Sequence, residues 1–274
     1  MKKSSIFFIG IFLLISCNKE FNKVLKSTDY EYKLEMANKY YNQGKYNKAQ
    51  QLFVELFPVM KGSDHFEDLY YKYAYCSYNL KDFEDAENLF NGYLGVFPNN
   101  PRAEEVAYMQ AYSFYRQSPK VELEQTNTQK AIGMMQTFMM TYPNSSRLAD
   151  AQEVINLCRA KLEEKQLKAA QLYYNLRQYQ AAGIYFNNLL INYPDSKKGE
   201  DYMLMTVKSY YQFAKMSVPA KQEERYQKVV SEYFDFADRY PESKLLKEAE
   251  SFKTISENSI KQLKDEQVKA SANS

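Results

Sequence analysis

The stretch that decides the fold is residues 36–58, which read MANKYYNQGKYNKAQQLFVELFP. In this stretch the pair Tyr40-Tyr41 is followed by Gly44 in a polar turn, and then by Ala49 and Phe53. Two residues four positions apart lie on one face of a helix, so Ala49 and Phe53 would pack together against a neighbour. The stretch therefore predicts two helices joined by a tight turn, with the second ended by Pro58.

The same arrangement recurs along the chain. An aromatic–Tyr or Ser–Tyr step occurs five times, at Tyr40-Tyr41, Ser77-Tyr78, Phe114-Tyr115, Tyr173-Tyr174 and Tyr210-Tyr211. The second tyrosine returns after 37 residues (41 to 78), 37 (78 to 115), 59 (115 to 174) and 37 (174 to 211). Such spacing indicates a stacked array of one helical hairpin, and the residue order matches the tetratricopeptide repeat (TPR). We predict an all-α TPR solenoid of five hairpins.

The repeats also predict the domain boundaries. Residues 30–145 would hold repeats one to three, and residues 146–260 a long helix plus repeats four and five. The long linking helix is predicted from about Ser146 to Asn175, because this stretch has an apolar stripe and no Gly or Pro. Two polar insertions are expected to be loops, residues 118–128 and 217–224. Residues 261–274 are expected to be a polar, frayed C-terminal tail.

The N-terminus resembles a bacterial lipoprotein signal peptide. Two lysines precede the apolar run of residues 6–15, which is too short to span a bilayer, and the run leads into Leu14-Ile15-Ser16-Cys17. The thiol of Cys17 could take the lipid, and the small Ser16 and aliphatic Leu14 before it suit the cleavage site. We expect residues 1–16 to be the signal peptide, Cys17 to carry acyl chains such as palmitate, and residues 17–29 to be a lipidated tether. The alternative is an ordinary secretory signal that contains a cysteine.

The balance of charges and the cysteines limit which ligands and bonds we expect. Removal of Lys2 and Lys3 with the signal peptide would leave 34 basic against 34 acidic residues. This balance argues against electrostatic capture of nucleic acid or of anionic lipid. Cys76 and Cys158 lie on apolar-periodic helices, so we expect buried free thiols, with a disulfide between separate repeats as the alternative.

We find no sequence motif for catalysis. The chain has no metal-ligand spacing, nucleophile elbow or phosphate-binding loop, and its one histidine, His65, lies in a polar loop. We therefore expect no enzymatic activity, no metal and no cofactor other than the lipid on Cys17.

The first helix of each TPR hairpin lines the concave groove of the array. The residues of repeats one to three expected in this groove are Asn38, Tyr41, Asn42, Tyr71, Tyr75, Tyr78, Asn79, Tyr108, Tyr112 and Tyr115. Tyrosine offers a large contact area with few rotors, and amides can bond a peptide backbone, so the groove would suit an extended, aromatic-rich peptide. The alternative is that these tyrosines pack between repeats. Asn38 and Asn42 also resemble the carboxylate clamp with which some TPR arrays bind the terminal carboxylate of a peptide. The lysine of that clamp is missing, because Leu34 stands in its place.

Taken together, the lipoprotein signal, repeat number, length and repeat ends resemble the BamD family of outer-membrane lipoproteins. The repeat ends that carry this resemblance are Tyr142 to Ser145, Tyr193 to Ser196 and Tyr240 to Ser243. The resemblance implies a non-enzymatic component of the outer-membrane β-barrel assembly (BAM) complex, anchored on the periplasmic face of the outer membrane.

The resemblance also implies two protein partners. A BamA-like barrel insertase would bind repeats four and five, including Tyr174, Asn175 and Tyr211. Unfolded outer-membrane β-barrel precursors would be received by repeats one to three. Two alternatives stay open: a lipid-anchored TPR scaffold for other cell-envelope complexes, and a surface glycan-binding lipoprotein of the SusD kind. The second relies on Trp for sugar stacking, and this chain has none.

Overall fold

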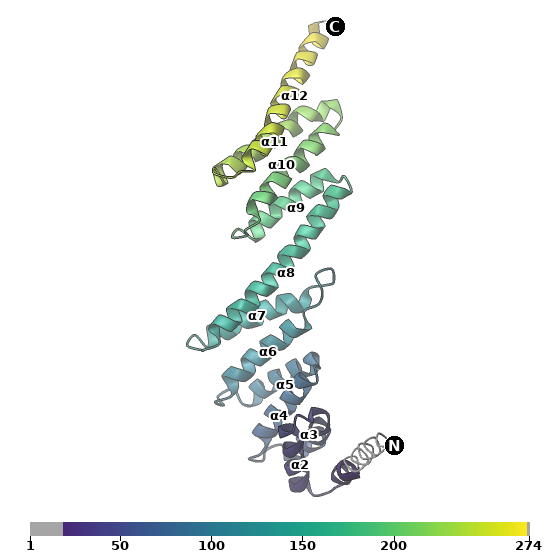
Figure 1. Ribbon diagram of the computed structural model, residues 1–274, viewed down its shortest axis with the longest axis vertical. Helices are drawn as coiled ribbons and strands as arrows, with labels where there is room; N and C mark the ends of the chain where they lie inside the picture. Colours follow the sequence, from purple (N-terminus) through teal and green to yellow (C-terminus); the bar gives the residue numbers. More distant parts are fainter. Residues whose placement is uncertain (1–18, 273–274) are drawn as a thin grey trace, which may run out of the picture. The chain divides into compact units, whose positions relative to one another are not determined.

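The computed structural model describes residues 19–272, and in this range all regular structure is helical (Figure 1). A short helix covers residues 19–25. The longer helices are α2 (Tyr30–Asn42), α3 (Tyr46–Met60), α4 (Phe66–Asn79), α5 (Phe83–Val96), α6 (Ala103–Gln117), α7 (Thr126–Thr141), α8 (Leu148–Asn175), α9 (Tyr179–Asn192), α10 (Gly199–Lys215), α11 (Pro219–Arg239) and α12 (Leu246–Ala272). The chain divides into two compact units, Met1–Arg159 and Ala160–Ser274, with the boundary inside α8. The predicted signal peptide and Cys17 lie outside the described residues.

Within each unit, helices that follow one another in the chain pack together. In unit 1 each helix from α2 to α7 contacts the next, and in unit 2 the same holds from α9 to α12. The predicted small–large pairs form the contacts: Ala49 and Phe53 of α3 have no exposed surface, and neither have their counterparts Ala86 and Phe90 of α5. The TPR fold and the long linking helix are thus confirmed.

The turn inside a hairpin has one repeated geometry. Gly44, Lys81 and Arg177 hold equivalent positions after the second tyrosine, with φ values of 69°, 66° and 60°. The N–H of Gly44 donates to the carbonyl of Tyr41 at 2.9 Å, and the next N–H donates to the carbonyl of Tyr40 at 2.9 Å. This is a Schellman ending, which closes the first helix and starts the second. Glycine adopts this left-handed backbone without the strain that the two long side chains bear.

A second repeated contact joins neighbouring hairpins. The serine of each Tyr-Pro-x-Ser repeat end donates its hydroxyl to a glutamate of an earlier helix, and its oxygen accepts an N–H two residues further on. The pairs are Ser145 with Glu104, Ser196 with Glu163, and Ser243 with Glu200. The glutamate partners lie 33 to 43 residues away in the sequence, so no local pattern predicts them. We call these three contacts the Ser–Glu ties.

Three segments are more regular than the sequence predicted. Residues 19–25 of the expected tether are helical, with Phe21 and Val24 buried. The expected loop 217–224 already enters α11 at Pro219, because proline at the first helical position costs no hydrogen bond. Residues 261–272 are the end of α12 and not a frayed tail. No Gly or Pro interrupts this end, and Leu263 packs on the unit 2 core.

Several local features either match the sequence-based predictions or differ from them slightly. Pro58 lies inside the last turn of α3, two residues before the helix ends, so it does not itself end the helix. The insertion at 118–128 is a loop up to Gln125. Cys76 and Cys158 are buried free thiols, as predicted, and burial raises the pKa of the Cys76 thiol to about 12. None of the described helices is both long and apolar enough to cross a bilayer.

The Ser–Glu ties predict unequal effects for two adjacent glutamates. The hydroxyls of Ser196 and of fully buried Tyr202 both donate to Glu163, the latter at 2.6 Å. Glu163→Ala leaves these donors without their acceptor and should lower the free energy of unfolding of unit 2 by roughly 2–3 kcal/mol in a urea titration.

The matched control is Glu164→Ala, which removes a solvated ion pair to Lys198 at 3.5 Å. This change should cost less than about 1 kcal/mol. Equal losses for the two variants would contradict the structural role given to Glu163.

Candidate functional site

Six tyrosines on the first helices of the unit 1 hairpins form the candidate site. We call them the tyrosine row: Tyr41, Tyr71, Tyr75, Tyr78, Tyr112 and Tyr115. Ring centroids are 4.7 Å apart for Tyr71 and Tyr75, and 6.5 Å apart for Tyr75 and Tyr78. The row continues onto α6, with 6.5 Å from Tyr78 to Tyr112 and 5.4 Å from Tyr112 to Tyr115. The residues on α4 meet because positions i, i+4 and i+7 share one helix face.

All six members of the tyrosine row are half-buried. Burial raises the pKa of the phenols of Tyr71, Tyr75 and Tyr78 above its usual value. The Tyr75 hydroxyl donates to Glu105 Oε1 at 2.6 Å, and the Tyr78 hydroxyl accepts from Arg116 at 3.2 Å. The row thus combines ring surface with hydroxyls that are already oriented.

Tyr108 corrects the sequence-based assignment. It was expected in the groove, but it is 6% exposed and therefore a packing residue. Its ring stacks on Tyr112 at 5.7 Å, meets the edge of Phe138 at 5.5 Å, and is covered by the guanidinium of Arg147 at 4.9 Å. Burial, together with the charge of Asp150, raises its pKa to about 12. Tyr108 therefore packs inside its own hairpin, α6 and α7, with Arg147 covering its ring.

The amides predicted beside the tyrosines lie near the row. Asn42 and Asn79 are exposed, whereas Asn38 is half-buried. Asn79 Nδ2 donates to the backbone carbonyl of Tyr75 at 2.7 Å, and Asn38 Oδ1 accepts from Lys72 Nζ at 2.8 Å. Asn42 is therefore the amide best exposed for a peptide backbone.

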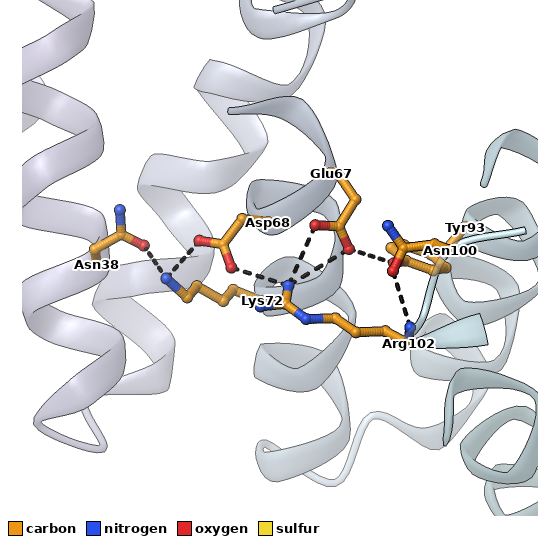
Figure 2. A network of polar contacts seen from close by, with 7 residues as sticks. All are labelled: Asn38, Glu67, Asp68, Lys72, Tyr93, Asn100 and Arg102. Carbon is orange, nitrogen blue, oxygen red and sulfur yellow. Dashed lines mark hydrogen bonds and ion pairs between the residues drawn. The ribbon is translucent and has the colours of Figure 1, made fainter. Parts of the chain in front are cut away.

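A network of charged side chains lies beside the row and joins α2, α4 and the start of α6 (Figure 2). Lys72 Nζ contacts Asp68 Oδ2 at 2.6 Å, and Arg102 contacts the other oxygen of Asp68 at 3.0 Å. Arg102 also pairs with Glu67 at 3.4 Å, and Glu67 accepts the hydroxyl of buried Tyr93. We call this the Asp68 network.

The Asp68 network orients two cations on the tyrosine row. The guanidinium of Arg102 lies 4.3 Å from the ring centroid of Tyr71, and Lys72 Nζ lies 5.9 Å from that of Tyr41. Partial burial by itself would raise the pKa of Asp68, but hydrogen bonds from Lys72 and Arg102 lower it below its usual value. Each cation is thus neutralised locally and holds a ring in place.

The sequence contained only part of the signal for this network. Asp68 and Lys72 are four apart on one helix, a spacing at which an ion pair is expected. Arg102 lies just before α6, 34 residues after Asp68, and no local pattern joins the two. Leu34, which stands where the clamp lysine would be, is buried, and the cation beside Asn38 is Lys72 from the next hairpin.

The residues predicted in repeats four and five lie in unit 2. Tyr174 is half-buried, and its ring centroid lies 5.3 Å from that of Tyr179. Asn175 is exposed. Tyr211 is half-buried against Phe252 of α12 at 5.0 Å. Unit 2 also has an open cleft of about 540 Å³, whose lining includes Tyr210, Phe213, Arg225 and Lys228. Within residues 19–269, whose side chains are described, no three His, Cys, Asp or Glu residues could hold a metal ion.

Stacked helical hairpins that carry tyrosines on their first helices define an all-helical TPR protein. A family model described as "YfiO: Outer membrane lipoprotein" matches residues 29–228, and the chain belongs to this family. The predicted membership of the BamD family is confirmed, and the chain is a non-enzymatic protein of that family.

Individual relatives are distant. The chain is 23% identical over 177 residues to a Rickettsia prowazekii protein named outer membrane protein assembly factor BamD, covering 62% of this chain and 70% of that one. A Caulobacter vibrioides protein of the same name is 21% identical over 169 residues, covering 62% and 55%. A solved TPR repeats protein from Bacteroides fragilis is 16% identical, covers 84% of this chain and 100% of that one, and has a TM-score of 0.40.

The Asp68 network predicts a pH-dependent contribution to stability. Asp68→Asn removes two ion pairs and should lower the free energy of unfolding at neutral pH by about 1 kcal/mol, because the partners are partly solvated. Since the folded pKa of Asp68 is lowered, its contribution is complete above about pH 4 and is lost as the pH falls through the folded value.

Urea titrations of wild type and Asp68→Asn at neutral and acid pH measure this effect. The difference between the two proteins should shrink at acid pH. Glu35→Gln is the control, since Glu35 is exposed on α2 outside the network. A difference that is equally large at both pH values would count against the lowered pKa.

Proposed function

We propose that this chain is a lipid-anchored assembly factor for outer-membrane β-barrel proteins. Its family is one of outer membrane lipoproteins, and the curated relatives are named outer membrane protein assembly factors. The observation that carries the proposal is the tyrosine row, because it offers a half-buried aromatic surface on the groove-lining helices of unit 1. The proposed complex is the BAM complex.

The proposed ligand of unit 1 is the extended C-terminal segment of an unfolded barrel precursor. Such a segment has aromatic side chains at alternate positions and unpaired backbone groups, which would otherwise aggregate. Tyrosine rings can receive its aromatic side chains at low entropic cost, and exposed Asn42 can bond its backbone. Hydroxyls already oriented by Glu105 and Arg116 reduce the ordering needed on binding.

Unit 2 is proposed to bind the periplasmic part of a BamA-like insertase. Tyr174, exposed Asn175 and Tyr211 are the residues assigned to this contact, and a separate cleft of unit 2 has the cations Arg225 and Lys228 in its lining. Arg225 is held over Phe213 at 4.0 Å, so its charge has a defined position. This arrangement suits a partner with acidic and aromatic side chains.

The proposed peptide site can be tested on the tyrosine row. Replacing Tyr41, Tyr78 and Tyr115 together by Ala should weaken binding of a barrel-derived C-terminal peptide by roughly 100-fold, because truncating one interface tyrosine costs about 1 kcal/mol and the three losses multiply. Fluorescence titration with a labelled peptide measures the affinity, and circular dichroism should show unchanged helicity.

The control for this test is the double change Tyr30→Ala and Tyr185→Ala. Both side chains are exposed, at 45% and 38%, and lie outside the row. Peptide binding should be the same as in wild type. If the triple variant bound the peptide as tightly as wild type, the tyrosine row would not be the binding surface.

The proposed lipid anchor can be tested at Cys17. Cys17→Ser removes the thiol to which lipid would attach, so the variant should leave the membrane fraction after cell fractionation. Metabolic labelling with palmitate should mark wild type and not the variant. Palmitate incorporation into Cys17→Ser would refute this assignment.

A further inference from the structure

The short helix of residues 19–25 is fixed to the first hairpin. Phe21 and Val24 are 7% and 0% exposed, and the Phe21 ring meets the edge of Tyr40 at 5.6 Å. Lys33 Nζ, itself buried and paired with Glu55 at 2.6 Å, donates to the carbonyl of Leu25 at 3.0 Å and so holds the end of the short helix. This segment is thus part of unit 1 and lies outside residues 29–228, which the family model matches.

The face opposite these contacts carries three lysines. Lys19 and Lys23 lie on the short helix and Lys26 in the turn that directly follows it, at positions i, i+4 and i+7, and all three are exposed. At about 100° per residue they share an arc of about 60°, directly opposite Phe21 and Val24. Glu20 lies to one side and pairs with Lys39 at 3.9 Å. No side chain of these three lysines forms a hydrogen bond or ion pair with another described residue.

The lysine face is close to the proposed anchor along the chain. Phe21 is four positions after Cys17, so the two Cα atoms are at most roughly 15 Å apart in any conformation. An acyl chain on Cys17 would therefore bring the short helix to the membrane surface. This approach of the short helix to the membrane rests on the lipid anchor at Cys17 that belongs to the proposed function.

We propose that Lys19, Lys23 and Lys26 bind the head groups of anionic phospholipids and hold the first hairpin against the membrane. Each lysine close to an anionic surface strengthens binding about fivefold, so three give roughly 100-fold. The balanced charge of the whole chain does not oppose this contact, because charges beyond about 10 Å are screened at physiological salt. Since Phe21 and Val24 fix the helix to α2 and α3, the lysines orient a hairpin and not a loose tether.

The test uses the mature chain with Cys17→Ser, which carries no lipid, and sedimentation with vesicles. The protein should bind vesicles that contain phosphatidylglycerol, bind phosphatidylcholine vesicles much less, and be released by high salt. The variant K19Q/K23Q/K26Q should bind phosphatidylglycerol vesicles roughly 100-fold more weakly. The control K197Q/K215Q/K247Q, which removes the same charge from exposed sites in unit 2, should bind like the parent.

Equal binding to both kinds of vesicle, or equal losses in the two triple variants, would overturn the proposal. Neither result depends on whether Cys17 is lipidated or whether the chain takes part in barrel assembly. A second measurement uses the lipidated wild type on the two kinds of vesicle. Trypsin cleavage after Lys23 and Lys26 should be slower on anionic vesicles, and equal cleavage rates would contradict the contact.

Discussion

The constraint on which this structure depends is that one helical hairpin cannot bury its own apolar stripe. Each hairpin has a small residue beside a phenylalanine, as with Ala49 and Phe53, and both become buried only when the neighbouring hairpin packs on them. The Schellman turns set where the second helix starts, and the Ser–Glu ties join one hairpin to the next. Stability is therefore distributed over a row of interfaces within each unit.

This constraint also explains how one set of helices can pack and bind. The first helices of the unit 1 hairpins must contact their neighbours and still present a surface. Half-buried tyrosines can meet both needs, because the ring packs on its neighbours while the hydroxyl has a polar partner, as in Tyr75 and Tyr78. The Asp68 network then orders the row by placing Arg102 on Tyr71 and Lys72 on Tyr41. The proposed binding surface is thus largely pre-organised.

The parts of this fold that could be predicted are those set by local pattern. The spacing of Tyr41 and Tyr78, and the absence of Gly and Pro around α8, were enough for the hairpins and the long helix, because each repeat encodes its own turn and interface. The burial of Tyr108 under Arg147 and the position of Arg102 depend on residues far apart in sequence. The docking of Phe21 on Tyr40 is likewise a tertiary contact, so the sequence alone predicts a tether in this segment.

We propose that a membrane-anchored array of hairpins serves barrel assembly. The most direct measurement is affinity purification of the native lipoprotein from detergent-solubilised envelope, followed by mass spectrometry. The account predicts recovery of a barrel-forming insertase in amounts comparable to the lipoprotein, together with unfolded barrel precursors. Recovery of envelope enzymes or secretion components, without any barrel protein, would contradict it.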